Sequence, residues 1–325
     1  VQLASEFRYL GERNDGIAQV EYLPDDEVFG DTRTFVSFNH RTLFENGWRN
    51  LVDISDVSDG NYFEDLRQSL SATSITQLNR SVLFDYYGEY WSFLGRVQDY
   101  QTIDETIPDD QRPYQRLPQL RFFSALPGEL AGFRASLDAE IVNFDRDVGV
   151  TGWRMDIQPK LGWPIERAGW FVKPEVVLQH TKYDLDNTIA GQDANPSRTL
   201  PISSIDTGMI LERRLNRGSN WVQTLEPRML YVHAPFREQD DLPIFDTILP
   251  DVNLVQLFQK DRFLGIDRIA DNDQLSIGVT SRILNGETGR EVVTATIGQT
   301  RYLSEQGVTL PVGNLTTDFS SDYVA

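Results

Sequence analysis

The stretch WRMDIQPKLGW, residues 153 to 163, alternates between apolar and polar side chains at every step. Successive side chains of an extended strand point to opposite faces, so this period of two predicts a β-strand with one apolar and one polar face. The apolar face carries Trp153, Met155, Ile157, Pro159, Leu161 and Trp163, and the polar face carries Arg154, Asp156, Gln158, Lys160 and Gly162. The same split recurs in residues 133–142 and 275–283 and in about fifteen segments altogether. We therefore predict an all-β protein.

The predicted strands are long, and the links between them alternate in length. Most strands have about ten to fourteen residues, against about five to six in soluble proteins. Short glycine-containing links lie at 11–16, 45–47, 87–89, 127–132, 165–169, 215–219 and 285–289. Longer links lie at 23–31, 58–72, 104–115, 145–152, 184–198, 235–272 and 304–315. This alternation predicts an antiparallel up-and-down order, in which each strand pairs with its neighbour.

Long strands with short turns at one end and long loops at the other are typical of outer-membrane barrels. Strands of this length can cross a hydrocarbon layer of about 25 to 30 Å. Aromatic residues near the strand ends fit the interfacial girdles of such barrels: Tyr22, Trp48, Trp91, Trp153, Trp163, Trp170, Trp221 and Tyr302. A soluble β-sandwich shows the same alternation but accounts for neither the strand lengths nor the loop pattern. We predict an incomplete section of a very large transmembrane β-barrel, with residues 1–325 as a single domain.

The composition narrows the class of partner. The 325 residues carry a net charge of −19, which disfavours nucleic acid, and they contain no cysteine for a disulfide or a thiolate metal site. The three histidines lie far apart without metal-binding spacing, so no metal site is expected. No run of 18 apolar residues exists, which excludes a transmembrane helix. The sequence shows no signal peptide and both ends have strand-like patterns, so we interpret it as a piece of a longer protein.

Four predicted strands contain a proline on the apolar face: Pro118, Pro159, Pro174 and Pro227. A proline removes one hydrogen-bond donor from the ladder and is expected at sheet edges or bulges. One interpretation places the four prolines near strand ends or bulges. The other holds that weakened pairing makes this wall more deformable.

The polar strand faces supply the candidate binding residues. A barrel of fifteen or more strands encloses a lumen too wide for side chains to fill, so these faces point at water or at a plug. The candidates for luminal or partner contact are Arg154, Asp156, Lys160, Lys173, Glu175, Glu226 and Arg228. No hydrolytic triad, P-loop or Rossmann turn is present, so no enzymatic activity is expected. Oxygen ligands at residues 271–273 have the chemistry for Ca²⁺, but their spacing matches no EF-hand.

The link from 235 to about 272 is too long for a structureless loop in a compact fold, so we expect it to be folded and functional. Residues 254–261 have the spacing of a short amphipathic helix. The charged candidates in this link are Arg237, Asp240, Asp241, Asp246, Arg262, Asp267 and Arg268. One hypothesis is that the loop folds inward and pairs its arginines with luminal carboxylates. The alternative is a surface cap that shields the barrel mouth.

Four motifs carry a family resemblance: VDISDVSDGNYFEDL (52–66), RLPQL (116–120), TLEPRMLYVHAPFREQDDLPIFDT (224–247) and FLGIDRIADNDQLSIGVTSRIL (263–284). In this order they resemble the outer-membrane LPS-assembly protein family, the LptD or organic-solvent-tolerance family. The resemblance covers essentially the whole chain. It implies the middle part of a barrel that inserts lipopolysaccharide (LPS) into the outer leaflet of the Gram-negative outer membrane.

The resemblance also implies partners. In this family a plug lipoprotein of the LptE type fills the lumen, and a periplasmic β-jellyroll domain receives LPS from a transport bridge. Relative to the family pattern, the jellyroll, the first and last barrel strands and the clamping cysteines are absent from this sequence. No cofactor is expected, apart from divalent cations that accompany LPS. The alternatives are a passive diffusion porin and, less favoured, a soluble β-rich carbohydrate-active protein.

Overall fold

The computed structural model describes residues 1–67, 74–126, 132–215, 220–251, 253–311 and 320–324. Its strands are β1 (Leu3–Leu10), β2 (Asn14–Leu23), β3 (Arg33–Leu43), β4 (Trp48–Val57), β5 (Gln77–Tyr87), β6 (Trp91–Thr102), β7 (Gln115–Ala125), β8 (Arg134–Asp145), β9 (Thr151–Gly162), β10 (Ile165–Arg167), β11 (Trp170–Asp186), β12 (Ser197–Met209), β13 (Leu211–Arg214), β14 (Trp221–Ala234), β15 (Asn272–Asn285) and β16 (Glu291–Tyr302). Three short helical segments are α1 (Tyr62–Leu66), η1 (Asp109–Gln111) and η2 (Gln256–Phe258). Among these residues no helix is long and apolar enough to cross a membrane.

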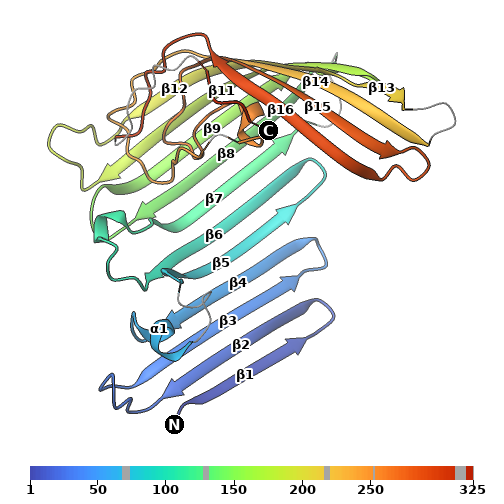
Figure 1. Cartoon of the computed structure of the whole chain (residues 1–325). Helices are drawn as coiled ribbons and strands as arrows, with labels where there is room; N and C mark the ends of the chain where they lie inside the picture. The colour runs from blue at the N-terminus through green and yellow to red at the C-terminus, as the bar shows by residue number, and fades with distance from the viewer. Residues whose placement is uncertain (68–73, 127–131, 216–219, 252, 312–319, 325) are drawn as a thin grey trace. The chain divides into compact units, whose positions relative to one another are not determined.

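The strands follow one another in hydrogen-bonded order from β1 to β9 and then β11, β12, β14, β15 and β16, while the short strands β10 and β13 pair with β11 and β14 (Figure 1). Neighbouring strands pair antiparallel, for example β1 with β2, β3 with β4 and β14 with β15. This confirms the predicted all-β, up-and-down order.

The chain forms two compact units. Unit 1 comprises Val1–Ser124, Asp138–Met155 and Lys182–Asn195, and unit 2 comprises Ala125–Leu137, Asp156–Thr181 and Pro196–Ala325.

Most short links are turns at the predicted places, for example between β1 and β2, β3 and β4, and β5 and β6. The prediction for 165–169 was wrong in part, because residues 165–167 form strand β10. Arg167 pairs with Trp170, so the turn is only the two residues between them, a usual length for a tight hairpin. Residues 127–131 and 216–219 of the predicted turns, and residues 68–72 and 312–315 of the predicted long links, lie outside the described residues.

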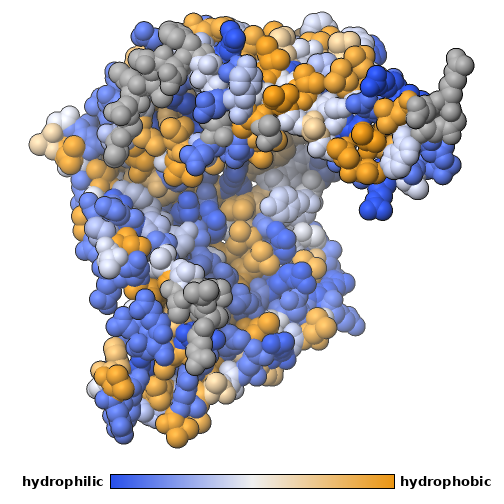
Figure 2. All heavy atoms as spheres, in the orientation of Figure 1, coloured by the Kyte–Doolittle hydropathy of each residue, from blue (hydrophilic) through white to orange (hydrophobic). Residues whose placement is uncertain are grey.

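The burial pattern of the strands is inverted relative to a soluble protein. Along β9 the apolar Trp153 and Ile157 are 38% and 42% exposed, whereas Arg154 and Asp156 are 1% and 2% exposed. Figure 2 shows hydrophobic residues spread over the visible surface of the molecule. A soluble β-sandwich buries its apolar face, so this pattern contradicts that alternative and suits strands with an apolar surrounding.

Two clusters of buried apolar residues include side chains from the long links. In unit 1 the link after β4 brings Tyr62 and Phe63 against Phe35, with Leu78 and Ile103 in the same cluster. In unit 2 a smaller cluster contains Phe263, Ala270 and Val308. The long links therefore contribute to apolar packing in both units.

The strand prolines differ in how regularly their strands pair. The pairing of β6 with β7 is irregular opposite Pro118, consistent with a bulge, whereas Pro227 pairs regularly with Val279 in the middle of β14. Thus the bulge interpretation holds for one proline and fails for another.

The helix predicted over 254–261 is only the 3-10 turn η2, since the chain is extended again at Gln259.

Candidate functional site: polar strand faces and their folded loops

In unit 1 a buried arginine fastens two long links to the sheet. Arg33, at the start of β3, is 1% exposed. Its Nε and Nη2 donate to the two carboxylate oxygens of Asp59 at 3.0 and 2.7 Å, and Nη1 donates to Asp65 at 2.8 Å. Asp26, in the link before β3, accepts a longer bond of 3.4 Å. A planar guanidinium suits this because it offers several donors in a fixed geometry.

The helix α1 is held on the same face by its aromatic residues. Tyr62 is fully buried, and its hydroxyl donates to Glu21 of β2 at 2.8 Å. Burial raises the pKa of Tyr62 to about 12, so the phenol stays protonated. Arg67 also donates to Glu21, and its guanidinium lies 5.4 Å from the Phe35 ring centre. These contacts make residues 58–67 a packed layer and not a free loop.

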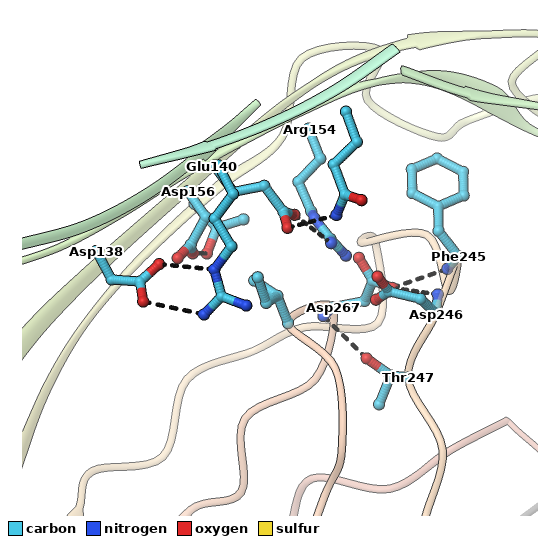
Figure 3. Close-up of polar contacts among 12 residues, drawn as sticks. Asp138, Glu140, Arg154, Asp156, Phe245, Asp246, Thr247 and Asp267 are labelled. Atoms are coloured by element: carbon cyan, nitrogen blue, oxygen red, sulfur yellow. Dashed lines mark hydrogen bonds and ion pairs between the residues drawn. The ribbon is translucent and has the colours of Figure 1, made fainter. Parts of the chain in front are cut away.

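Ion pairs continue along the polar face of unit 1. Arg121 of β7 makes a two-pronged contact with Asp138 of β8, and Arg154 Nη2 lies 2.7 Å from Glu140 (Figure 3). Gln119 donates to the second oxygen of Glu140 at 2.8 Å. Because Arg154 and Glu140 are both buried, the paired arrangement is needed to offset their loss of hydration.

In unit 2 five further strand candidates have polar partners. Asp156 accepts from Gln179 at 2.9 Å and Thr181 at 2.7 Å. The other pairs are Lys173 with Glu166, Glu175 with Lys260, Arg228 with Asp206, and Glu226 with Arg282. Lys160 is half-buried. The predicted set is therefore spread along several strands and does not converge on one point.

A second buried arginine binds the long link of unit 2, residues 235–271. Arg198 of β12 donates from Nη1 to Gln239 at 2.6 Å and to the Asp267 carbonyl at 3.1 Å. Its Nη2 donates to Thr181 of β11 at 2.9 Å and to the Ile266 carbonyl at 2.7 Å. One side chain thus joins two strands to both halves of the link.

The link is also held together internally. The Asp267 carboxylate accepts the backbone N–H groups of Phe245 and Asp246 at 2.8 and 2.9 Å, while its own N–H donates to Thr247 at 2.9 Å (Figure 3). Arg268 donates to backbone carbonyls at 242, 243 and 267. Asp267 and Arg268 are buried, so this part of the link has the bonding of a folded core.

Two glycines allow the link to pack directly against strands β15 and β16. Gly278 of β15 and Gly298 of β16 are direct register partners. A Cβ atom at Gly278 would lie 2.9 Å from the Phe258 ring, and one at Gly298 would overlap Leu257. Leu257 is 1% exposed, and the Phe258 ring lies 4.4 Å beneath the Arg228 guanidinium. We call these paired glycines the glycine seat. A side chain at either position would occupy the space of Leu257 or Phe258, so the link can approach the strands this closely only where the strand residue is glycine.

Further bonds attach the link to the polar strand faces. In these contacts a lysine, and not one of the three arginines expected to do so, pairs the link with a strand carboxylate; Arg268 bonds backbone carbonyls and Arg237 is exposed. Lys260 Nζ lies 2.5 Å from Glu175 of β11, and Asn272 donates to the Lys260 carbonyl at 2.8 Å. Arg262 donates to Gln306 and to the carbonyl at 308. The other charged candidates lie nearer the surface: Arg237, Asp240 and Asp241 are exposed and Asp246 is half-buried.

The side chains at 271–273 bind different protein groups and do not point at a common centre in these bonds. Asp271 accepts the backbone N–H groups at 307 and 308, Asn272 donates to a carbonyl, and Asp273 accepts from Tyr231. Across the described ranges of the chain, no group of three or more acidic, histidine or cysteine residues has a geometry for a metal ion.

The sequence interpretation missed Arg33, Arg198 and the glycine seat. The arginines lie next to long links, and most of their partners are 26 to 69 residues away in the sequence, so no local sequence pattern predicts these contacts. The glycines did carry a signal, since a glycine inside a strand marks a close approach of another segment.

The strands expose an apolar face, and their opposite face carries ion pairs and folded loops. This arrangement is typical of the wall of an outer-membrane β-barrel protein. Residues 31–325 match the family model of LptD, LPS transport system D. The LPS-assembly protein LptD of Nitrosococcus oceani is 40% identical over 326 residues, which cover 99% of this chain and 44% of that protein. The chain therefore belongs to the LptD family, and the resemblance of its four motifs is confirmed.

Other relatives agree. The LPS-assembly protein LptD of an Azoarcus species is 40% identical over 95% of this chain and 39% of its own length, and that of Alkalilimnicola ehrlichii is 38% identical over 99% and 44%. The chain spans less than half the length of these relatives. A solved bacterial polysaccharide outer membrane secretin aligns over 93% of this chain and 83% of its own at 8% identity, with a TM-score of 0.35, which is too weak to bear on the fold.

Proposed function

We propose that this chain is part of an integral outer-membrane wall that inserts LPS into the outer leaflet of a Gram-negative cell. The inverted burial of the strands carries the proposal: exposed Trp153 and Ile157 alternate with buried Arg154 and Asp156. An apolar outer face holds such a wall in lipid, and a polar inner face receives hydrophilic groups. Membership of the LptD family supports LPS as the cargo.

The proposed mechanism is geometric and not enzymatic. The polar face and the link 235–271 contact a plug lipoprotein of the LptE type and the sugars of LPS. A jellyroll domain elsewhere in the full-length protein joins the wall to the periplasmic LPS bridge, and divalent cations accompany the LPS phosphates at the surface. The charged side chains that face away from the exposed apolar side support this role.

Depletion of the full-length protein tests the proposal. Surface LPS, measured by labelling intact cells, should fall as the protein is depleted and recover when it is supplied again. Unchanged surface LPS would refute the transport role.

A passive diffusion porin is the second candidate, since it shares the exposed apolar face. A porin shows steady single-channel conductance without a partner, whereas a plugged assembly wall conducts little until its lipoprotein is removed. Heat-dependent gel mobility, typical of membrane barrels, distinguishes both from a soluble carbohydrate-active protein.

A further inference from the structure

Unit 2 contains a cavity of about 490 Å³ beside the glycine seat. Residues 256–262 of the long link form one wall, and Gln274, Thr300 and Tyr302 on β15 and β16 form another. Residues 320–324, which pair with β16, close a third side. The volume falls within the range of about 300 to 1,000 Å³ that is usual for small-molecule sites.

The lining is rich in amides and phenols. Gln256, Gln259, Gln274, Gln306, Tyr302 and Tyr323 all contribute. Gln274 donates its amide N–H to the Gln259 carbonyl at 3.2 Å. The Gln256 carbonyl oxygen has no hydrogen-bond partner within the part of the chain that the structure describes. An amide offers both a donor and an acceptor, which matches a hydroxyl group that also does both.

The charges of the cavity disfavour an anionic ligand. Three carboxylates, Asp251, Asp261 and Asp322, line it together with one guanidinium, that of Arg262. Asp261 already accepts the backbone N–H of Phe263 at 2.9 Å. Arg262 is directed to Gln306 and to a backbone carbonyl. A phosphate would therefore meet net negative charge, whereas a neutral polyol would not.

The cavity is preformed by the fold. Leu257 on the glycine seat and the Lys260 contact with Glu175 hold the loop wall in place on both sides of Gln259. A ligand then binds without first ordering the loop, which lowers the entropic cost of binding.

We propose that this cavity is a subsite for neutral sugar residues of LPS. The inference rests on the proposed function and specifies the part of the cargo that the polar face contacts. Amides of Gln256 and Gln274 hydrogen-bond the sugar hydroxyls, and the Tyr302 ring provides an amphipathic surface for the sugar face.

The test uses the full-length protein purified with its lipoprotein in detergent and Gln256→Leu as the variant. Binding is measured by saturation-transfer NMR with three probes: a neutral oligosaccharide released from LPS, the phosphorylated lipid A disaccharide, and a linear glucan. The LPS oligosaccharide should bind best, and Gln256→Leu should weaken it about tenfold. Because Gln256→Leu removes an unpartnered acceptor, the thermal midpoint should not fall.

Gln223→Leu is the matched control, since Gln223 bonds to Ser281 and Arg213 outside the cavity, and it should leave binding unchanged. Tyr302→Phe should weaken binding less than Tyr302→Ala. Absence of oligosaccharide binding, or equal binding by Gln256→Leu, would overturn the subsite. Preference for the phosphorylated probe or the glucan would overturn the sugar class or its LPS source. Surface LPS after depletion reports separately on the proposed function.

Discussion

Arg33 shows how one side chain can hold a long link on a membrane wall. Arg33→Met leaves the carboxylates of Asp59 and Asp26 without their counter-charge, both of them largely buried. We expect a loss of about 3 kcal/mol in the free energy of unfolding, at the low end for a buried pair because Asp65 is half-exposed. Urea unfolding of the full-length protein in detergent measures it.

Arg8→Met is the control, because the pair of Arg8 with Glu6 is exposed to solvent and should contribute little to the free energy of unfolding. If both substitutions lowered the free energy of unfolding by the same amount, burial would not be the reason that the Arg33 ion pairs stabilise the protein.

Asp261 makes the long link of unit 2 sensitive to pH. Burial raises the pKa of its carboxyl from 3.8 to about 6, although the N–H groups of Phe263 and Ala270 and the charges of Arg198 and Arg262 favour ionisation. Between these two pKa values the folded link binds more protons than the unfolded chain, so its stability rises as the pH falls from 7 toward 4. Amide exchange over 256–270, corrected for intrinsic rates, should be slower at pH 5 than at pH 7.

Asp261→Asn should remove this pH dependence, whereas Asp240→Asn, at an exposed position of the same link, should retain it. Protection that increases with pH would contradict the assignment of a raised pKa to Asp261.

The sequence predicted individual strand residues better than loop residues for a physical reason. Arg154 and Asp156 lie opposite the exposed Trp153 and Ile157, as the alternation predicts, because alternation is a local property of an extended chain. Arg198 was missed because its role depends on Gln239 and Asp267, which the fold brings to it from a distant link.

At the scale of elements, the glycine seat explains how residues 257 and 258 of the long link pack against strands β15 and β16. Gly278→Val puts carbon atoms where the Phe258 ring lies and should lift Leu257 from its buried site. Exposing a buried leucine costs about 2 kcal/mol, which corresponds to roughly thirtyfold faster amide exchange over 256–262.

The double variant Gly278→Val/Phe258→Ala should restore most of the protection, because the smaller side chain leaves room for valine. Gly162→Val serves as the control, since a Cβ at Gly162 meets nothing nearer than 3.6 Å. An undisturbed link in the single variant would mean that the seat does not position it.

The strand prolines allow a separate prediction. If missing ladder donors make the wall deformable, amides flanking Pro159 and Pro174 should exchange faster than those in the proline-free strand β15. Pro118 is a poor test because the adjacent pairing is already irregular. Protection around Pro159 and Pro174 equal to that of β15 would rule out the deformability hypothesis.

For the molecule as a whole, two sequence features predicted the strand order: period-two alternation and the alternation of short and long links. Both are set locally, since strand faces follow from backbone geometry and tight turns join only neighbours. The path of residues 235–271 was not predictable in the same way. It depends on Arg198, the glycine seat and Lys260 acting together, and the charge pattern of the link fits a surface cap as well as an inward fold.

The membrane setting of the wall can be tested with two adjacent residues of one strand. Ile157 lies on the exposed apolar face of β9, and Gln158 lies on the opposite face, where it donates to Asp156 at 2.7 Å. In lipid, Ile157→Lys places a charge in hydrocarbon and should cost about 2 to 4 kcal/mol, whereas Gln158→Lys adds a cation beside a carboxylate and should cost less than about 1 kcal/mol. Folding of the full-length protein into vesicles, followed by heat-dependent gel mobility, measures both. A soluble setting predicts little penalty for Ile157→Lys, because water would solvate the new charge.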